Sequence, residues 1–169
     1  MPNAFNPDVV YKIAVDLERS ASAFFESAYS RLESGDAKQL LYKLAVWEKS
    51  HIETLEELLK GYPLSSRQPA EIDASARRIV SIAQESIFRE REQAASADFR
   101  TPLDALNLAL KIEKNSVLFY RALNEYIAHD SGAEFVKKIL KDEVEHIKMI
   151  SARIKALSDG ESAGNGDAV

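Results

Sequence analysis

Two parts of the chain repeat one spacing of glutamate and histidine. The pattern Glu-x29-Glu-x2-His occurs twice, and the second copy follows the first at an offset of 95 positions. The repeated positions are Glu18, Glu48 and His51 in the first copy and Glu113, Glu143 and His146 in the second. Residues three apart on a helix share a face, so each Glu-x-x-His pair can offer a carboxylate and an imidazole to one point. Any fold of this chain has to accommodate that pattern twice.

The similarity between the two parts extends beyond these six positions. When residues 13–59 are placed on residues 108–154, further identities appear. They are Ala14 with Ala109, Phe24 with Phe119, Lys43 with Lys138, and Ile52 with Ile147. We interpret the two parts as an internal duplication of one structural unit.

Apolar residues recur at helical spacing in four segments of similar length. The expected helices are Asp8–Arg31, Asp36–Lys60, Thr101–His129 and Ala133–Leu157. Turn and cap residues separate them: Gly35 between the first two, Gly61 and Pro63 after the second, Thr101 and Pro102 at the start of the third, and Gly132 before the fourth. The sequence therefore predicts an all-α protein.

The connections between these helices predict their topology. The first and second helices, and the third and fourth, have short joins and should form antiparallel hairpins. A crossover of about 40 residues, 61–101, joins the hairpins and is long enough to run the length of a four-helix bundle. We expect the crossover segment Ala74–Gln93 to add a helix. The bundle domain should span residues 1–157, and the polar tail 158–169 should be disordered.

Composition excludes several classes of protein. The chain has no cysteine, which excludes thiolate zinc sites, cysteine-ligated iron–sulfur clusters and disulfides. A net charge of −5 provides no excess of positive charge that would attract nucleic acid. No uncharged apolar run reaches the roughly 20 residues of a membrane span. The N-terminus shows no secretory signal. We therefore expect a cytoplasmic protein with neither a nucleic-acid nor a membrane partner.

All four repeated glutamates interrupt apolar helix stripes. Glu18, for example, is in line with Ala14, Ala21 and Phe25. A buried carboxylate costs several kcal/mol unless a cation compensates it. No core-facing lysine or arginine is apparent, because Arg19, Lys49, Lys114 and Lys148 fall beside the stripes. Two divalent metal ions would balance four carboxylates. The alternative is that each Glu-x-x-His pair lies exposed on its helix and binds no metal. That explanation suits a single Glu-x-x-His motif better than it suits the repeated pattern.

Together these motifs resemble the di-iron carboxylate site of the ferritin-like superfamily, and the rubrerythrin-type proteins most closely. The segments Ala109–Lys114 and Asp142–His146 contribute most to the resemblance, which covers about residues 8–157. It implies a ferritin-like four-helix bundle and two iron ions, with manganese or zinc as the other metals such ligands accept. It further implies that Glu48 and Glu143 bridge the ions. The remaining ligands would be Glu18 and His51 for one ion and Glu113 and His146 for the other.

The chain departs from rubrerythrin in two respects. It lacks the cysteine-rich rubredoxin domain, so electrons would come from an external donor or from ferrous iron. Where rubrerythrin has an additional glutamate, one turn after the ligand on the third helix, this chain has Ser116. The six-ligand set is in this respect similar to the ferroxidase centre of bacterioferritin. With no fifth C-terminal helix of the ferritin type, a homodimer is expected rather than a shell, and Trp47, Tyr29, Tyr42 and Phe135 are interpreted as packing or dimer contacts.

The function expected from the resemblance is oxidation of ferrous iron, or reduction of H2O2 or O2, in iron handling or oxidative-stress defence. One alternative is an iron-binding or delivery protein that does not turn over. Another is a structural interaction bundle with a vestigial site. The sequence also leaves open whether helix hairpins are swapped between two chains.

Overall fold

Four long helices make up most of the molecule. In the computed structural model, residues 7–61, 77–85, 101–127 and 131–164 are described. The long helices are α1 (Pro7–Arg31), α2 (Asp36–Lys60), α4 (Pro102–Tyr126) and α5 (Ala133–Gly164). Residues 77–85 form a shorter helix between α2 and α4 in the chain. The described ranges contain no strand, so the all-α class is confirmed.

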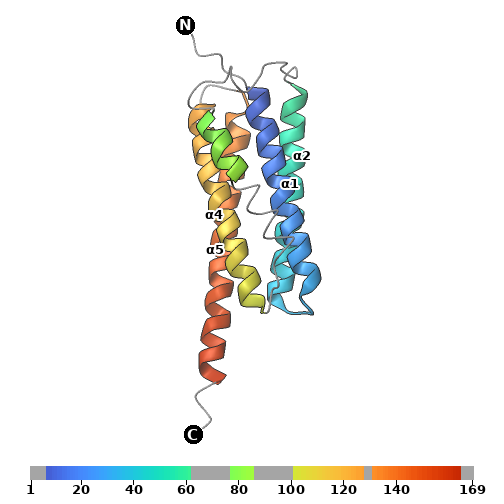
Figure 1. The fold of residues 1–169 in the computed structure, drawn as a ribbon, viewed down its shortest axis with the longest axis vertical. Coiled ribbons are helices and arrows are strands. Elements are labelled where there is room, and N and C mark those ends of the chain that lie inside the picture. The colour runs from blue at the N-terminus through green and yellow to red at the C-terminus, as the bar shows by residue number, and fades with distance from the viewer. Residues whose placement is uncertain (1–6, 62–76, 86–100, 128–130, 165–169) are drawn as a thin grey trace.

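The helices form two antiparallel hairpins, α1 with α2 and α4 with α5, packed side by side (Figure 1). The end of α2 and the start of α4 lie at opposite ends of the bundle, so α4 runs in the same direction as α2. This is the topology that the short joins and the long crossover predict.

Local chemistry explains where the helices begin and end. Gly35 precedes α2 with a φ of 99°, a left-handed conformation that glycine adopts without a Cβ clash. The backbone N–H of Gly61 donates to the Leu58 carbonyl at the end of α2. At α4, the Thr101 hydroxyl accepts from the Asp104 N–H while the Asp104 carboxylate accepts from the Thr101 N–H, which completes a capping box.

Helix α5 is longer than the sequence predicts. It continues to Gly164, so the expected end at Leu157 and the expected disorder from residue 158 are wrong for this stretch. The i, i+4 ion pair of Lys155 and Asp159, at 2.5 Å, lies within this extension. Residues 165–169 lie outside the described residues.

The crossover prediction is confirmed in part. Residues 77–85 are helical and bury Ile79 and Ala83 against the bundle. The rest of the expected helix Ala74–Gln93 lies outside the described residues. The third long helix ends at Tyr126 rather than at His129, and His129 itself is not among the described residues.

The core consists of two apolar clusters. One contains Tyr11, Phe119, Tyr120 and their neighbours, and the other contains Phe24 and Phe25 with theirs. On each of the four long helices, the repeated glutamates and histidines lie in sequence between the residues of the two clusters. A polar layer therefore crosses the middle of an otherwise apolar interior.

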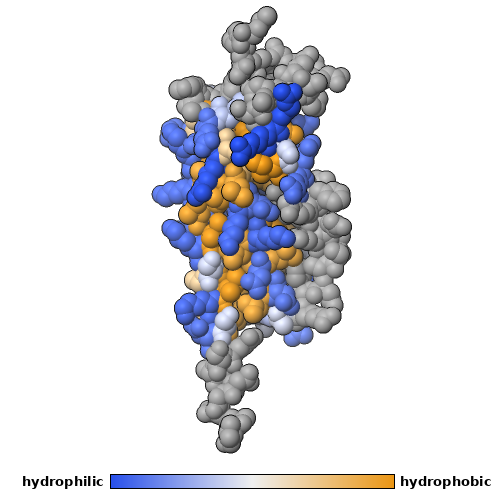
Figure 2. All heavy atoms as spheres, turned by 60° about the vertical axis from the view of Figure 1, so that its left-hand side comes forward, coloured by the Kyte–Doolittle hydropathy of each residue, from blue (hydrophilic) through white to orange (hydrophobic). Residues whose placement is uncertain are grey.

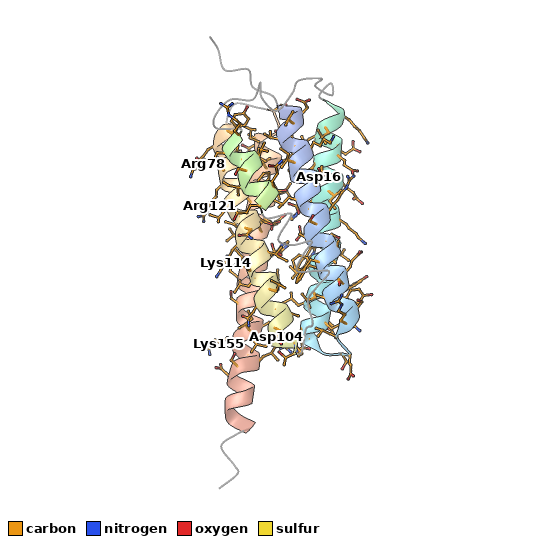
Figure 3. The ribbon with its side chains drawn as sticks, in the orientation of Figure 1. Asp16, Arg78, Asp104, Lys114, Arg121 and Lys155 are labelled. Atoms are coloured by element: carbon orange, nitrogen blue, oxygen red, sulfur yellow. The ribbon has the colours of Figure 1, made fainter. Side chains whose placement is uncertain are left out.

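Charged side chains cover much of the outside. In Figure 3, Lys114, Arg121 and Lys155 lie along the outer edge of the α4/α5 hairpin. Figure 2 shows an apolar strip bordered by hydrophilic side chains on the face that this hairpin presents. The exposed large apolar residues in the described part of the chain are Tyr42, Val46, Leu118 and Phe135. None of the described helices has the length and apolar character needed to cross a membrane.

Candidate metal centre

All six residues of the repeated pattern face the interior of the bundle. The long helices supply them as follows: α1 Glu18, α2 Glu48 and His51, α4 Glu113, and α5 Glu143 and His146. None is more than 6% exposed. The i, i+3 spacing on α2 and on α5 aims each carboxylate and imidazole in one direction, as the sequence predicts.

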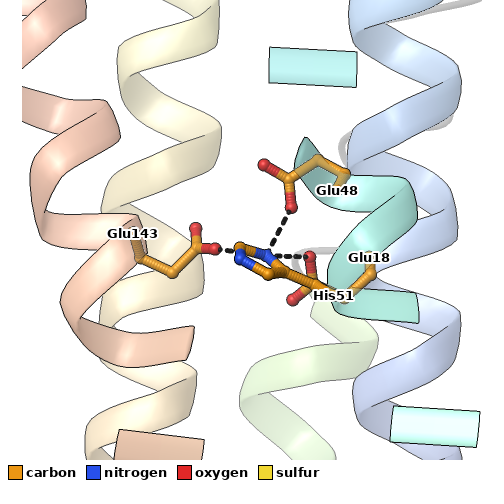
Figure 4. Close-up of side chains that lie close together, drawn as sticks. All are labelled: Glu18, Glu48, His51 and Glu143. Atoms are coloured by element: carbon orange, nitrogen blue, oxygen red, sulfur yellow. Dashed lines mark hydrogen bonds and ion pairs between the residues drawn. The ribbon is translucent and has the colours of Figure 1, made fainter. Parts of the chain in front are cut away.

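His51 lies at the centre of the first group of side chains (Figure 4). Its Nδ1 is 3.0 Å from a Glu143 oxygen, 3.3 Å from a Glu48 oxygen and 3.5 Å from a Glu18 oxygen. Three carboxylates and an imidazole nitrogen thus converge from α1, α2 and α5.

His146 occupies the same place in the second group. Its Nδ1 is 3.3 Å from a Glu48 oxygen, 3.3 Å from a Glu113 oxygen and 4.0 Å from a Glu143 oxygen. The two imidazole rings are stacked with centroids 5.7 Å apart, so the two groups are adjacent.

Each group could hold one metal ion. Within each, one ligand atom per residue lies within 4.8 Å of all the others. Glu48 and Glu143 belong to both groups, whereas Glu18 and His51 belong only to the first and Glu113 and His146 only to the second. The structure therefore brings all six predicted residues together in two groups that share Glu48 and Glu143.

The donor atoms fit a metal better than they fit each other. Buried oxygens of Glu18, Glu48, Glu113 and Glu143, and Nδ1 of His146, have no hydrogen-bond partner. A buried polar atom without a partner costs about 1–3 kcal/mol. Carboxylate oxygen and imidazole nitrogen are ligands suited to iron, manganese and zinc. Divalent ions in the two groups would satisfy these atoms and balance their charge.

Crowded carboxylates shift each other's protonation. Burial, and then the negative charge of Glu143, raise the pKa of Glu48 well above its ordinary value. The same two causes, in the same order, raise the pKa of Glu113. Without a cation, the centre resists holding all its carboxylates ionised.

Glu18 behaves differently. Burial would raise its pKa, but the close contacts with Glu48, His51 and the Tyr120 hydroxyl together outweigh burial and lower it. The Tyr120 hydroxyl donates to a Glu18 oxygen, and the pKa of Tyr120 is raised by its burial and by the Glu18 charge. Glu18 is therefore the carboxylate that its surroundings favour as an anion.

The two histidines also differ. Burial opposes a charge on both. At His51 the carboxylates of Glu143, Glu18 and Glu48 outweigh burial and raise the pKa, whereas at His146 burial dominates and the pKa is lowered.

Sequence reasoning missed three neighbours of the centre. Tyr120 fits an apolar helical stripe, and this pattern gives no sign of its bond to Glu18. Asp142, on α5, lies 3.6 Å from Nε2 of His51 on α2, and Trp47, on α2, stacks on the His146 ring at 5.2 Å. Each contact joins different helices, so no spacing along one helix reveals it. The one sequence signal for these neighbours is the presence of aromatic residues in the apolar stripes of the helices.

The basic residues beside the stripes lie at the surface, as predicted. Arg19 pairs with Glu56, Lys49 with Glu26 at 2.5 Å, and Lys148 with Glu145 at 2.9 Å, and all three basic side chains are more than half exposed. These exposed pairs contribute little stability. They do not neutralise the buried carboxylates.

A pocket of about 260 Å³ opens between α2 and α5 beside the centre. Both site histidines line it, together with Trp47, Asp142 and Met149. It thus brings solvent-accessible space up to two groups that are otherwise buried.

Comparison with known proteins matches this chain to one family. A family model described as "Ferritin-like domain" matches residues 9–156. Searches of curated proteins and of solved structures return no match.

Proposed function

Since the chain belongs to the ferritin-like family, we propose that it is a non-haem di-iron protein that oxidises ferrous iron or reduces peroxide or O2. The observation that carries this proposal is the pair of buried four-residue groups that share two carboxylates. Shared carboxylates can bridge two ions, which a pair of separate sites cannot do.

The proposed ligand roles follow this division. Glu48 and Glu143 would be shared by the two ions. Glu18 and His51 would complete one position, and Glu113 and His146 would complete the other. Four carboxylates balance two divalent cations, so the neutral imidazoles add no charge to the interior. The ligand types favour iron or manganese without excluding zinc.

When two ferrous ions are bound, each can supply one electron, so that H2O2 gains two electrons and two protons and leaves as two water molecules. The chain's own residues contribute to this reaction by excluding water and by giving access from solvent. The two apolar clusters keep water away from both ends of the polar layer. The pocket lined by His51 and His146 gives a small oxidant or an incoming ion a path from solvent.

The electrons must be replaced from outside the chain. With no cysteine there is no cysteine-ligated iron–sulfur cluster in it. Ferrous iron can serve as both substrate and electron source, which corresponds to a ferroxidase. An external donor would make the protein a peroxidase. Both are consistent with a role in iron handling or oxidative-stress defence.

The test compares ferrous oxidation in the wild type with the double variant Glu48→Ala/Glu143→Ala. Protein is loaded anaerobically with ferrous iron, and ferric absorbance is followed after addition of O2 or H2O2. We expect the wild type to oxidise iron rapidly and the double variant to match the protein-free rate. Glu53→Ala, an exposed change on α2, is the matched control and should behave as the wild type.

Unchanged iron oxidation in the double variant would refute the proposed centre. A single stoichiometric oxidation without further turnover would instead indicate an iron-binding or delivery protein. The oxidant that reacts faster decides between the ferroxidase and peroxidase forms of the proposal.

A further inference from the structure

The two halves of the centre repeat their ligands but not the residues that support those ligands. At the offset of 95 that relates the halves, Tyr120 corresponds to Phe25, and Asp142 corresponds to Trp47. In each pair, one half has a residue with a hydroxyl or a carboxylate, and the other half has an aromatic residue with neither group. Both polar members contact the position formed by Glu18 and His51.

Tyr120 supports the carboxylate of that position. It is fully buried on α4, and its hydroxyl donates to Glu18 on α1, the other hairpin. A hydrogen bond to an ionised carboxylate is stronger than a neutral one and fixes the orientation of the acceptor. Phe25, at the equivalent place, has no hydroxyl to offer Glu113.

Asp142 supports the imidazole of the same position. A metal on Nδ1 of His51 requires the neutral tautomer with its proton on Nε2, and Nε2 is the atom that faces the Asp142 carboxylate at 3.6 Å. A carboxylate that accepts the N–H of a ligating histidine fixes the tautomer and makes the ring a stronger ligand, and a small closure of the 3.6 Å distance would form this bond. Trp47, the counterpart, instead stacks flat on His146 with an interplanar angle of 12°.

We propose that Asp142 and Tyr120 are positioning residues that make the Glu18/His51 position the tighter of the two, so that the first divalent ion binds there. This inference rests on the proposed dinuclear centre. The Glu113/His146 position, supported by aromatic side chains, fills second.

Two-step binding alone does not test the inference. Two cations that share Glu48 and Glu143 repel each other, so a symmetric centre would also bind its second ion more weakly. The asymmetry appears only when each half is changed separately. The experiment therefore compares the same measurement across variants of the two halves.

Co²⁺ is the probe, because it is a stable divalent ion with visible absorption that reports its ligands. Metal-free protein is titrated without oxygen, by calorimetry and by absorbance, to give the affinity of each step. We expect His146→Gln to keep the first-step affinity of the wild type, and His51→Gln to lose it. The reverse order, or equal losses in both variants, would overturn the inference.

The positioning residues are then changed directly. Asp142→Asn and Tyr120→Phe should each weaken the first step about 10-fold or more, the range found for partners of metal ligands, and leave the second step nearly unchanged. Asp142→Glu, which keeps the carboxylate, should retain most of the first-step affinity. Equal weakening of both steps, or of neither, would overturn the proposal.

Glu145→Gln is the matched control. Glu145 lies on the same helix and lines the same pocket, but it pairs with Lys148 at the surface, so its loss should change neither step. If Glu145→Gln and Asp142→Asn have the same effect, general charge rather than positioning is responsible, and the inference is wrong.

Thermal unfolding of the metal-free variants, followed by circular dichroism, shows whether they are folded. Asp142 is 41% exposed, so Asp142→Asn is expected to fold even if Tyr120→Phe does not. Failure of the wild type to bind Co²⁺ would refute the dinuclear centre itself. Binding of two ions with indistinguishable half-site variants would refute only this inference.

Discussion

The half of the centre built on Glu18 and His51 differs from the half built on Glu113 and His146 in its surroundings rather than in its ligands. Burial is the same for both glutamates, yet the pKa of Glu18 is lowered and that of Glu113 is raised after burial and hydrogen bonding are combined. The Tyr120 hydroxyl accounts for part of this difference. If the two halves arose by internal duplication, the candidate metal ligands are the same in both while the residues around them differ.

The two halves stabilise their buried carboxylates in different ways. A buried carboxylate can be stabilised by a hydrogen-bond donor of the protein or by a bound cation. One oxygen of Glu18 has the Tyr120 hydroxyl as a donor in the absence of metal, although Glu18 and Glu113 each also have one oxygen without a hydrogen-bond partner. We therefore expect the second half to depend more strongly on a bound cation for its stability.

Removing the metal from both halves should have the largest effect on the molecule. A ligand present at 100 times its Kd stabilises the folded state by about 2.7 kcal/mol, which corresponds to roughly 5–10 °C in Tm for a chain of this size. We expect Co²⁺ to raise the Tm by at least that amount, as measured by differential scanning calorimetry. Glu48→Ala/Glu143→Ala should show no Co²⁺-dependent shift. Equal Tm values with and without Co²⁺ in the wild type would contradict the account.

Neutralising one terminal glutamate at a time sharpens the comparison. In the metal-free protein, Glu18→Gln should lower the free energy of unfolding by about 1–3 kcal/mol, because the charged acceptor of Tyr120 is lost. Glu113→Gln should leave that free energy unchanged or raise it, since an amide removes repulsion from Glu143. Urea unfolding at pH 8 measures both. A greater loss from Glu113→Gln than from Glu18→Gln would contradict the assigned difference.

The dependence of stability on pH gives the smallest of these effects. A carboxyl group with a raised pKa binds its proton more tightly in the folded state. Its contribution to stability is complete below the ordinary value of 4.5 and is lost as pH rises through the raised folded value. Glu48 and Glu113 should therefore make the metal-free protein less stable between about pH 5 and pH 8.

Glu18, with a lowered pKa, contributes in the opposite sense: its stability is present above 4.5 and is lost only as pH falls through its folded value. It does not offset the loss at higher pH. Urea unfolding in a pH series tests the prediction, and Glu113→Gln should flatten the curve. A metal-free protein that becomes more stable from pH 5 to pH 8 would show that the crowded carboxylates do not dominate.

Much of the fold could be predicted because it depends on local signals. Apolar periodicity, Gly35, the Thr101 cap and Gly132 place the starts of all four long helices within one residue. The predicted end of α5 at Leu157 is too early because the polar composition of residues 158–169 indicates disorder, whereas the helix continues to Gly164 with an ion pair between Lys155 and Asp159. Intrahelical pairing of this kind depends on side-chain geometry that composition does not reveal.

The six candidate ligands could be predicted for a different reason. A glutamate within an apolar stripe conflicts with its surroundings, and a conflict repeated at a fixed offset is visible in a single sequence. The supporting residues produce no such conflict. Tyr120 fits an apolar stripe and Asp142 resembles a surface residue, so their contacts with the opposite hairpin emerge only from the packing of the bundle.

The most direct test of the central claim is the iron content of the protein after anaerobic loading with ferrous iron and removal of unbound metal. We predict two iron ions per chain in the wild type and none in Glu48→Ala/Glu143→Ala, because both positions share these carboxylates. A wild type that retains no iron, or a double variant that retains as much as the wild type, would contradict the claim that this buried layer is a dinuclear metal centre.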